Sequence, residues 1–170
     1  PIDPENCEAW GLRGDMFIAL GRYDDAMKAF KKALDINPRD YGALYGQGTV
    51  YYLTSKFDDA LQAYDRVLKE DPGSFGAWNE KGDCLESLNK FEEAKRAYNE
   101  SLRISKEATI MNPSNEFAWI FMGLSLHRLG IFEEAIKAYD AALSINPTSY
   151  KARDAKGQSL SEMGRYDEAV

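Results

Sequence analysis

Few residues of this sequence carry the side chains on which most enzyme and metal chemistry depends. The chain contains two cysteines, Cys7 and Cys84, and one histidine, His127. A structural zinc site needs four such ligands, and a catalytic nucleophile needs a neighbouring base. No phosphate-binding loop, dinucleotide fingerprint, HExxH or GxSxG motif occurs. We therefore expect no enzyme activity, no catalytic residue, no metal site and no cofactor.

The composition is that of a globular protein with a hydrophobic core. Of the 170 residues, 44% are hydrophobic, 29% are charged and 12% are aromatic, and the formal net charge is −7. An acidic surface repels phosphate groups, which argues against nucleic acids and anionic membranes as partners. No apolar run approaches the roughly 18 residues of a membrane-spanning helix, and no signal peptide opens the sequence. These features predict a cytoplasmic protein.

The sequence repeats itself with a period of about 34 residues. If Cys7 is position 1, alanine recurs at positions 3 and 20, glycine at position 8 and an aromatic residue at position 17, and a proline closes each complete unit. We expect the tail of a preceding repeat at 1–6, followed by five repeat units. The units are repeat 1 at 7–40, repeat 2 at 41–74, repeat 3 at 75–115, repeat 4 at 116–149 and a truncated repeat 5 at 150–170.

Each unit is predicted to form two antiparallel helices, over about positions 2–14 and 18–30. Glycine or asparagine near position 15 suits a left-handed helix end, the closing proline ends the second helix, and a pair of acidic residues opens it. The first helix has two packing sides. Positions 4, 7, 8 and 11 are expected to face the second helix, and the small residues at positions 3 and 10 to face the preceding unit. These features predict an all-α solenoid of stacked antiparallel helix hairpins.

Repeat 3 is seven residues longer than the others. Ile104, Ala108 and Met111 follow an i, i+4, i+7 spacing, which predicts that the second helix continues to about Met111 with these residues on one apolar face. The extension is interpreted as a tolerated insertion at a unit junction. The alternative is a protrusion, or a change of superhelix pitch, that is used in recognition.

The repeat pattern resembles the tetratricopeptide repeat family, whose signature is W-x2-L-G-x2-Y, A-x3-F and a proline over 34 residues. Trp78, Gly82, Ala94 and Pro113 and their counterparts carry the match. The sequence departs from the usual leucine at position 7, where the residues are Arg13, Gln47, Lys81, Met122 and Lys156. The resemblance implies a right-handed superhelix with the first helices on its concave face, and a role as a protein–protein interaction scaffold.

The resemblance also implies where a partner would bind. The family uses the side of the first helix that faces away from the second helix, which corresponds to positions 2, 5, 9, 12 and 13. The candidate partner-binding groove consists of Asp15, Tyr45, Thr49, Tyr52, Asn79, Asp83, Glu86, Phe117, Ile120, Leu124, His127 and Arg128. Phe117, Ile120 and Leu124 form an outward apolar strip that a peptide, a helix or another chain is expected to cover.

One subclass of the family grips the C-terminal carboxylate of heat-shock chaperones with lysine, asparagine and arginine at fixed positions. In this sequence those positions hold Gly11, Asp15, Gly46, Gly76 and Glu80. Acidic residues repel a carboxylate. We therefore expect no binding of acidic chaperone C-terminal peptides.

The expected function is a non-enzymatic scaffold that binds a peptide or helix of a partner in its concave groove, as a fragment of a longer repeat array. Two alternatives remain. The module could self-assemble through uncapped repeat ends, with Ala9 and Met16 exposed at one end and Leu160 and Met163 at the other. It could also be the regulatory repeat region of an enzyme whose catalytic domain lies outside this chain.

Overall fold

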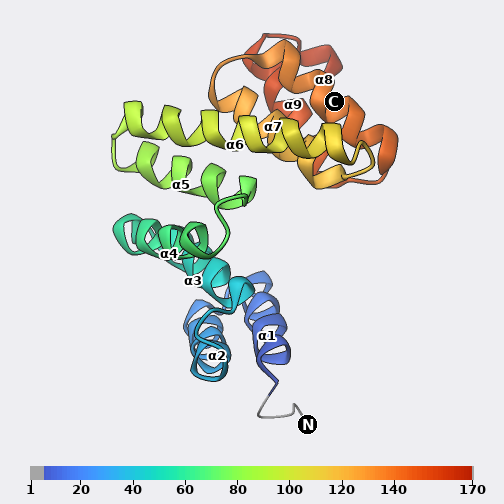
Figure 1. The fold of residues 1–170 in the computed structure, drawn as a ribbon. Coiled ribbons are helices and arrows are strands. Elements are labelled where there is room, and N and C mark those ends of the chain that lie inside the picture. Colours follow the sequence, from blue (N-terminus) through green and yellow to red (C-terminus); the bar gives the residue numbers. More distant parts are fainter. Residues whose placement is uncertain (1–5, 170) are drawn as a thin grey trace. The chain divides into compact units, whose positions relative to one another are not determined.

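The computed structural model describes residues 6–169, which form nine α-helices, one short 3-10 helix and no β-strand (Figure 1). The all-α class predicted from the repeat pattern is confirmed. The helices are α1 (Cys7–Ala19), α2 (Tyr23–Ile36), α3 (Tyr41–Leu53), α4 (Phe57–Glu70), α5 (Phe75–Ser87), α6 (Phe91–Met111), α7 (Glu116–Arg128), α8 (Phe132–Ile145) and α9 (Tyr150–Glu162), and the 3-10 helix is Tyr166–Glu168.

The chain divides into two compact units. Unit 1 comprises residues 1–72 and 83–90, and unit 2 comprises residues 73–82 and 91–170. Within unit 1, α1 packs on α2 and α3 packs on α4, and α1 also contacts α3. Within unit 2, α7 packs on α8 and contacts α9. The predicted tail at 1–6 lies outside the described residues except for Asn6, whose side chain caps α1 by accepting a hydrogen bond from the Ala9 amide at 3.0 Å.

Each hairpin turns at one residue in the left-handed backbone conformation. The φ angle is 68° at Gly21, 58° at Ser55, 60° at Asn89, 77° at Gly130 and 73° at Gly164. In repeat 1 the amide of Arg22, which follows Gly21, donates to the Phe17 carbonyl at 2.8 Å. This bond closes the helix end and sends the chain back along α1.

The two helices of a hairpin approach closely because a glycine of the first helix receives an aromatic ring of the second. A Cβ atom at Gly48 would lie only 2.8 Å from Cε1 of Tyr64. In unit 1 the Phe30 ring lies against Gly14 of its own hairpin and also against Gly46 of the next one. Phe30 and Tyr64 are both 0% exposed, so these rings form the centre of the core.

The second packing side of the first helices holds small buried residues, as predicted. Cys84, at position 10 of repeat 3, packs with Ala60 and Tyr64 of α4 and is a core residue. Met16, at the same position of repeat 1, is 67% exposed. The expectation that Leu160 would be exposed is wrong, because only 2% of this residue is accessible. Helix α9 packs on α8 and contacts the 3-10 helix, and Met163 is half-buried.

Helix α6 has 21 residues, whereas α2, α4 and α8 have 14 each. Its buried face is not the predicted apolar stripe, since Met111 is 87% exposed. The buried residues toward its C-terminal end are instead Ser101, Ser105 and Thr109. Small polar side chains tolerate this burial because their hydroxyls are hydrogen-bonded. Ser101 donates to the Phe75 carbonyl at 2.8 Å and Ser105 to the Leu102 carbonyl at 3.1 Å.

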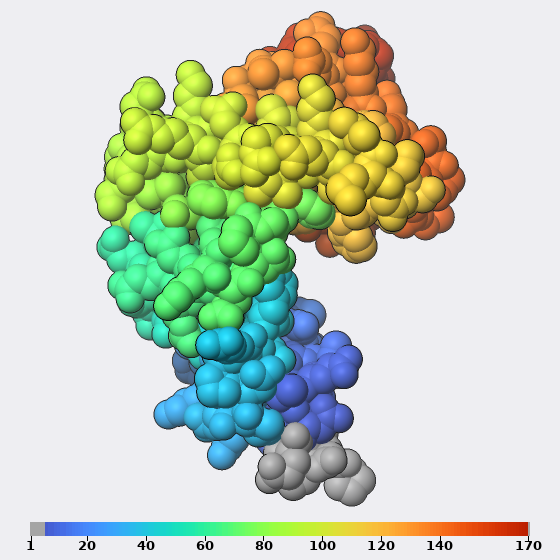
Figure 2. Space-filling view, in the orientation of Figure 1, coloured from blue at the N-terminus to red at the C-terminus, as the bar shows by residue number. Residues whose placement is uncertain are grey.

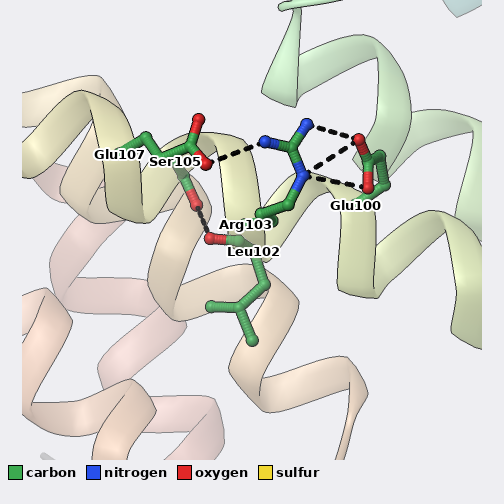
Figure 3. A network of polar contacts seen from close by, with 5 residues as sticks. All are labelled: Glu100, Leu102, Arg103, Ser105 and Glu107. Atoms are coloured by element: carbon green, nitrogen blue, oxygen red, sulfur yellow. Dashed lines mark hydrogen bonds and ion pairs between the residues drawn. The ribbon is translucent and has the colours of Figure 1, made fainter.

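The opposite side of α6 lies at the surface of unit 2 (Figure 2). There Arg103 pairs with Glu100 one turn before it and with Glu107 one turn after it (Figure 3). The hydrogen bonds and charge of Arg103 hold the pKa of Glu100 below its ordinary value. Such exposed pairs each contribute only about 0.3–0.5 kcal/mol to helix stability, so α6 depends mainly on its buried serine face.

The close approach at Gly82 generates the first prediction. Gly82→Ala should lower the free energy of unfolding by about 1–3 kcal/mol, because the new methyl group overlaps the buried Tyr98 ring. Gly11→Ala is the matched control, since a Cβ at Gly11 meets nothing within 4 Å. That variant should gain about 0.5–1 kcal/mol from helix propensity. Thermal melting of both variants checks that one substitution lowers stability and the other raises it. A Gly82→Ala protein as stable as the parent would contradict the contact between Gly82 and the Tyr98 ring.

Candidate functional site

Unit 1 has a cavity between its first helices, α1 and α3. We call this cavity the tyrosine pocket, and its volume is about 390 Å³. It is open because Ala19 and Gly42 leave space where larger side chains would close the gap. The lining residues are Asp15, Ile18 and Ala19 from α1, and Tyr41, Gly42, Tyr45, Gly46 and Thr49 from α3.

Ring contacts hold the aromatic wall of the tyrosine pocket in place. Tyr41 stacks on Tyr45 with ring centroids 6.1 Å apart, and Tyr45 packs edge-on against the buried Tyr64 at 5.4 Å. The Thr49 hydroxyl donates to the Tyr45 carbonyl at 3.2 Å. Tyr52, one helical turn further along α3, packs on the same core and edge-on against Phe57 at 5.6 Å. The wall is therefore preformed.

Asp15 supplies the only charged side chain among the residues that line the tyrosine pocket. Burial raises the pKa of its carboxyl above the ordinary 3.8 of aspartate. Within residues 6–169, no basic side chain is paired with Asp15. Helix α3 carries no charged residue at all. The pocket thus combines aromatic rings with one negative charge that the described part of the chain does not neutralise.

Unit 2 has a cavity in the equivalent place, between α7 and α9. This polar pocket has a volume of about 670 Å³. Two of its charged residues are hydrogen-bonded within the chain, since Arg153 donates to the Pro147 carbonyl at 2.6 Å and Asp154 accepts from Gln158 at 2.9 Å. Its lining residues are His127, Tyr150, Arg153, Asp154, Gly157, Gln158, Ser161, Glu162 and Ala169. The pocket is therefore polar and carries charges of both signs.

His127 is the polar pocket's residue from α7. Its Nδ1 atom lies 2.8 Å from the Ser159 hydroxyl, and its ring packs edge-on against Phe132 at 5.3 Å. Both contacts fix the orientation of the ring.

A third cavity, of about 370 Å³, lies between α1 and α2 and outside the predicted groove. There the Arg13 guanidinium lies over the rings of Trp10 and Phe17, 5.2 and 5.3 Å from their centroids. Arg22 and Lys28 pair with Asp25, and these hydrogen bonds hold its pKa below the ordinary value. At position 7 of repeat 1, a cation on aromatic rings thus replaces the leucine typical of the family.

The predicted groove residues divide between the two units. Asp15, Tyr45 and Thr49 line the tyrosine pocket together, and His127 lines the polar pocket. The remaining predictions lie outside these cavities: in unit 1 Tyr52 and Asp83 are half-buried and Glu86 is exposed, and in unit 2 Phe117 and Arg128 are exposed and Leu124 is half-buried.

Two predicted groove residues are buried, which corrects the expectation of an outward position. Ile120 is 1% exposed and packs with Ala142 of α8 and Ala152 of α9. Asn79 is 3% exposed, and its Nδ2 donates to the Ser125 hydroxyl of α7 at 3.0 Å. Both residues occupy position 5, where the next first helix covers the side chain. The predicted apolar strip is therefore reduced to Phe117 and part of Leu124.

The sequence prediction missed two aromatic residues that line the pockets. Tyr41 is 41% exposed and lines the tyrosine pocket, and Tyr150 is 80% exposed and lines the polar pocket. Both occupy position 1 of their repeats. They lie one helical turn before position 5, which places them on the same helix face as the predicted residues. An exposed aromatic residue at position 1 is the signal that could have identified them.

Metal chemistry and membrane insertion find no support in the described part of the chain. Among residues 6–169, no three histidine, cysteine or acidic side chains are grouped closely enough to hold a metal ion. None of the helices in that range combines the length and the apolar character that crossing a membrane requires.

Two family models, both described as tetratricopeptide repeat, match the chain. One matches residues 45–109, and the other matches residues 7–40 and 117–149. Together they cover more than half of the sequence, with all of α1, α2, α4, α5 and α8 and most of α3, α6 and α7. No curated protein matches the chain.

Solved structures show the same fold. TTC0263, a thermophilic TPR protein of Thermus thermophilus, is 27% identical with a TM-score of 0.76, over 96% of this chain and 86% of that one. A MamA fragment from Desulfovibrio magneticus RS-1 is 20% identical with a TM-score of 0.56, over 96% and 88% of the two chains. YrrB, described as a TPR protein with an unusual peptide-binding site, is 18% identical with a TM-score of 0.51, over 98% and 82%.

The partial desolvation of Asp15, which is still exposed, generates the second prediction. Because its pKa is higher in the folded chain than in the unfolded chain, the charged carboxyl lowers stability at pH 7, and this cost disappears as the pH falls through 3.8. Asp15→Asn should therefore raise the melting temperature at pH 7, by no more than about 1 °C because the carboxyl is exposed. This difference in melting temperature between variant and parent should disappear in acid. A difference that is absent at pH 7, or that does not change with pH, would contradict the desolvation of this carboxyl.

Proposed function

Because the chain belongs to the tetratricopeptide repeat family, we propose that it binds an extended or helical segment of a partner protein in the cavities between its successive first helices. Proteins of this family are protein-interaction scaffolds and are generally not enzymes. The observation that carries the proposal is the preformed tyrosine pocket between α1 and α3.

The tyrosine pocket has the properties of a site that anchors a peptide side chain. Binding sites are concave, mostly apolar, largely preformed, and contain a few well-placed polar groups. Here Tyr41, Tyr45 and Ile18 supply apolar surface, and Asp15 supplies the polar group. Tyrosine is also enriched at the centre of protein interfaces, because its ring buries a large area at a small entropic cost.

The polar pocket of unit 2 is the second proposed contact region. His127, Tyr150 and Gln158 offer hydrogen-bonding groups and one exposed ring to a bound segment. The description of YrrB, which shares the fold, supports a peptide as the type of ligand. The negative charge of Asp15 supports the expectation that acidic chaperone C-terminal peptides do not bind.

Filling the tyrosine pocket tests the proposal. Gly42 lines the pocket, and a Cβ atom there makes only an ordinary contact of 3.6 Å with Asp40. Gly42→Trp should therefore fill the cavity without disturbing the core. Peptides selected by the parent protein from a displayed random library should bind this variant at least about tenfold more weakly, because an interface anchor contributes about 2 kcal/mol or more.

Gln62→Trp is the matched control, because Gln62 is exposed on α4 and lines none of the three cavities. Calorimetric titration of the parent and both variants gives the affinities, and an acidic chaperone C-terminal peptide serves as the peptide expected not to bind. If selection enriches no peptide, or if Gly42→Trp binds as well as Gln62→Trp, the proposed function is wrong.

A second candidate function is self-association through α1. Leu12, Met16 and Leu20 are 59%, 67% and 68% exposed and are spaced four residues apart, so they form one apolar stripe. The residues that correspond to Leu12 and Met16 in repeat 2 are Gly46 and Val50, which are buried. The stripe thus has the character of a packing surface.

Changing this stripe to glutamine tests the second candidate. The parent should associate as its concentration rises, and the Leu12→Gln, Met16→Gln, Leu20→Gln variant should stay monomeric, because the apolar area that drives association is gone. Phe91→Gln is the control, since Phe91 is 60% exposed on α6 of unit 2. Light scattering over a concentration series measures the mass, and a monomeric parent at high concentration excludes this candidate.

A further inference from the structure

The negative charge in the tyrosine pocket has no counterpart in the described part of the chain. The only basic residue of α1 is Arg13, two positions before Asp15. Its guanidinium is held on the far side of the helix, over the rings of Trp10 and Phe17. Helix α3, which forms the opposite wall, carries no charge. Asp15 is therefore the one charged side chain that lines the pocket.

This carboxylate gains more from an incoming cation than a fully hydrated one would. Asp15 is exposed, but its neighbours in the pocket remove part of its hydration, which is the cause of its raised pKa. A Coulomb interaction is also stronger where the local dielectric constant is low. A neutral ligand that covered Asp15 would leave a charge without a partner, and an acidic ligand would be repelled. The pocket thus discriminates by charge.

The remaining lining residues suit the stem and the head of a basic side chain. Tyr41 is 41% exposed and stacks on Tyr45, so the aromatic wall presents ring surface to the cavity. Ammonium and guanidinium groups are attracted to the faces of such rings within about 6 Å. Ile18 and Ala19 offer apolar surface against which a methylene chain packs.

We infer that the tyrosine pocket binds a lysine or arginine side chain of the partner segment, with the cationic head at Asp15 and the stem against Ile18 and the ring of Tyr41. This inference rests on the proposed function, because it names the side chain that the bound segment inserts. The polar pocket is less selective, since its lining carries a cation, Arg153, beside the carboxylates of Asp154 and Glu162.

The test uses the peptides that the parent protein selects from a displayed library of random nonamers. Binders whose affinity falls in Gly42→Trp should share one lysine or arginine. In a synthetic copy of the tightest binder, replacing that residue by glutamine should weaken binding to the parent about tenfold. With the Asp15→Asn protein, the same replacement should weaken binding less than about twofold. The basic side chain of the peptide and the Asp15 carboxylate form one interacting pair, so losing the second group after the first has little further effect.

Asp35→Asn is the control protein, since Asp35 is an exposed carboxylate of α2 that lines none of the three cavities. The Asp35→Asn substitution removes one negative charge, as Asp15→Asn does. In this control protein the glutamine replacement in the peptide should still weaken binding about tenfold. Thermal melting verifies that each variant is folded.

The possible failures are distinguishable. Binders that depend on Gly42 but share no basic residue overturn the inference and leave the proposed function in place. If the glutamine replacement weakens binding equally in the parent and in the Asp15→Asn protein, the inference is also overturned and the proposed function stays in place. If no selected peptide depends on Gly42, the proposed function fails and the inference fails with it.

Discussion

The contact between a glycine backbone and an aromatic ring sets the geometry of each complete hairpin. The missing side chain at Gly14, Gly48, Gly82 or Gly123 lets the ring of the second helix lie directly on the first helix. The close approach fixes the angle between the two helices of the hairpin. That angle fixes where the first helix of the next repeat can pack. Because the cavities occur between successive first helices, their existence also depends on this contact. The small residues Ala19 and Gly42 then leave the gap in unit 1 open.

The sequence predicts this framework well because the information is local and repeated. The left-handed turn at position 15, the glycine–ring pair and the buried small residues recur in several repeats, so a deviation in one of them does not hide the pattern. Ser55 and Asn89, for example, adopt the same backbone conformation as Gly21. The identity of each helix and the interior position of Cys84 therefore follow from the sequence alone.

The errors arise where a distant helix decides the outcome. Position 5 lies on the outward side of its own hairpin, but α9 covers Ile120 and α7 covers Asn79. Hydrophobic periodicity cannot predict burial by another helix, because it describes one helix at a time. The buried face of α6 was misassigned for a related reason. Serine hydroxyls such as that of Ser101 are satisfied by backbone carbonyls, so a polar face becomes the inner one.

The position of the Phe30 ring has a consequence for how this array could have diversified. The ring occupies space in two repeats at once, since it lies against Gly14 and Gly46. The residues that correspond to Gly46 in the later repeats are Glu80, Phe121 and Ala155, and none of them leaves the same room. Repeat 1 could therefore not be moved in front of another repeat by recombination without a compensating change. The repeats are alike in sequence but are not interchangeable, and their order is part of the information that specifies the fold.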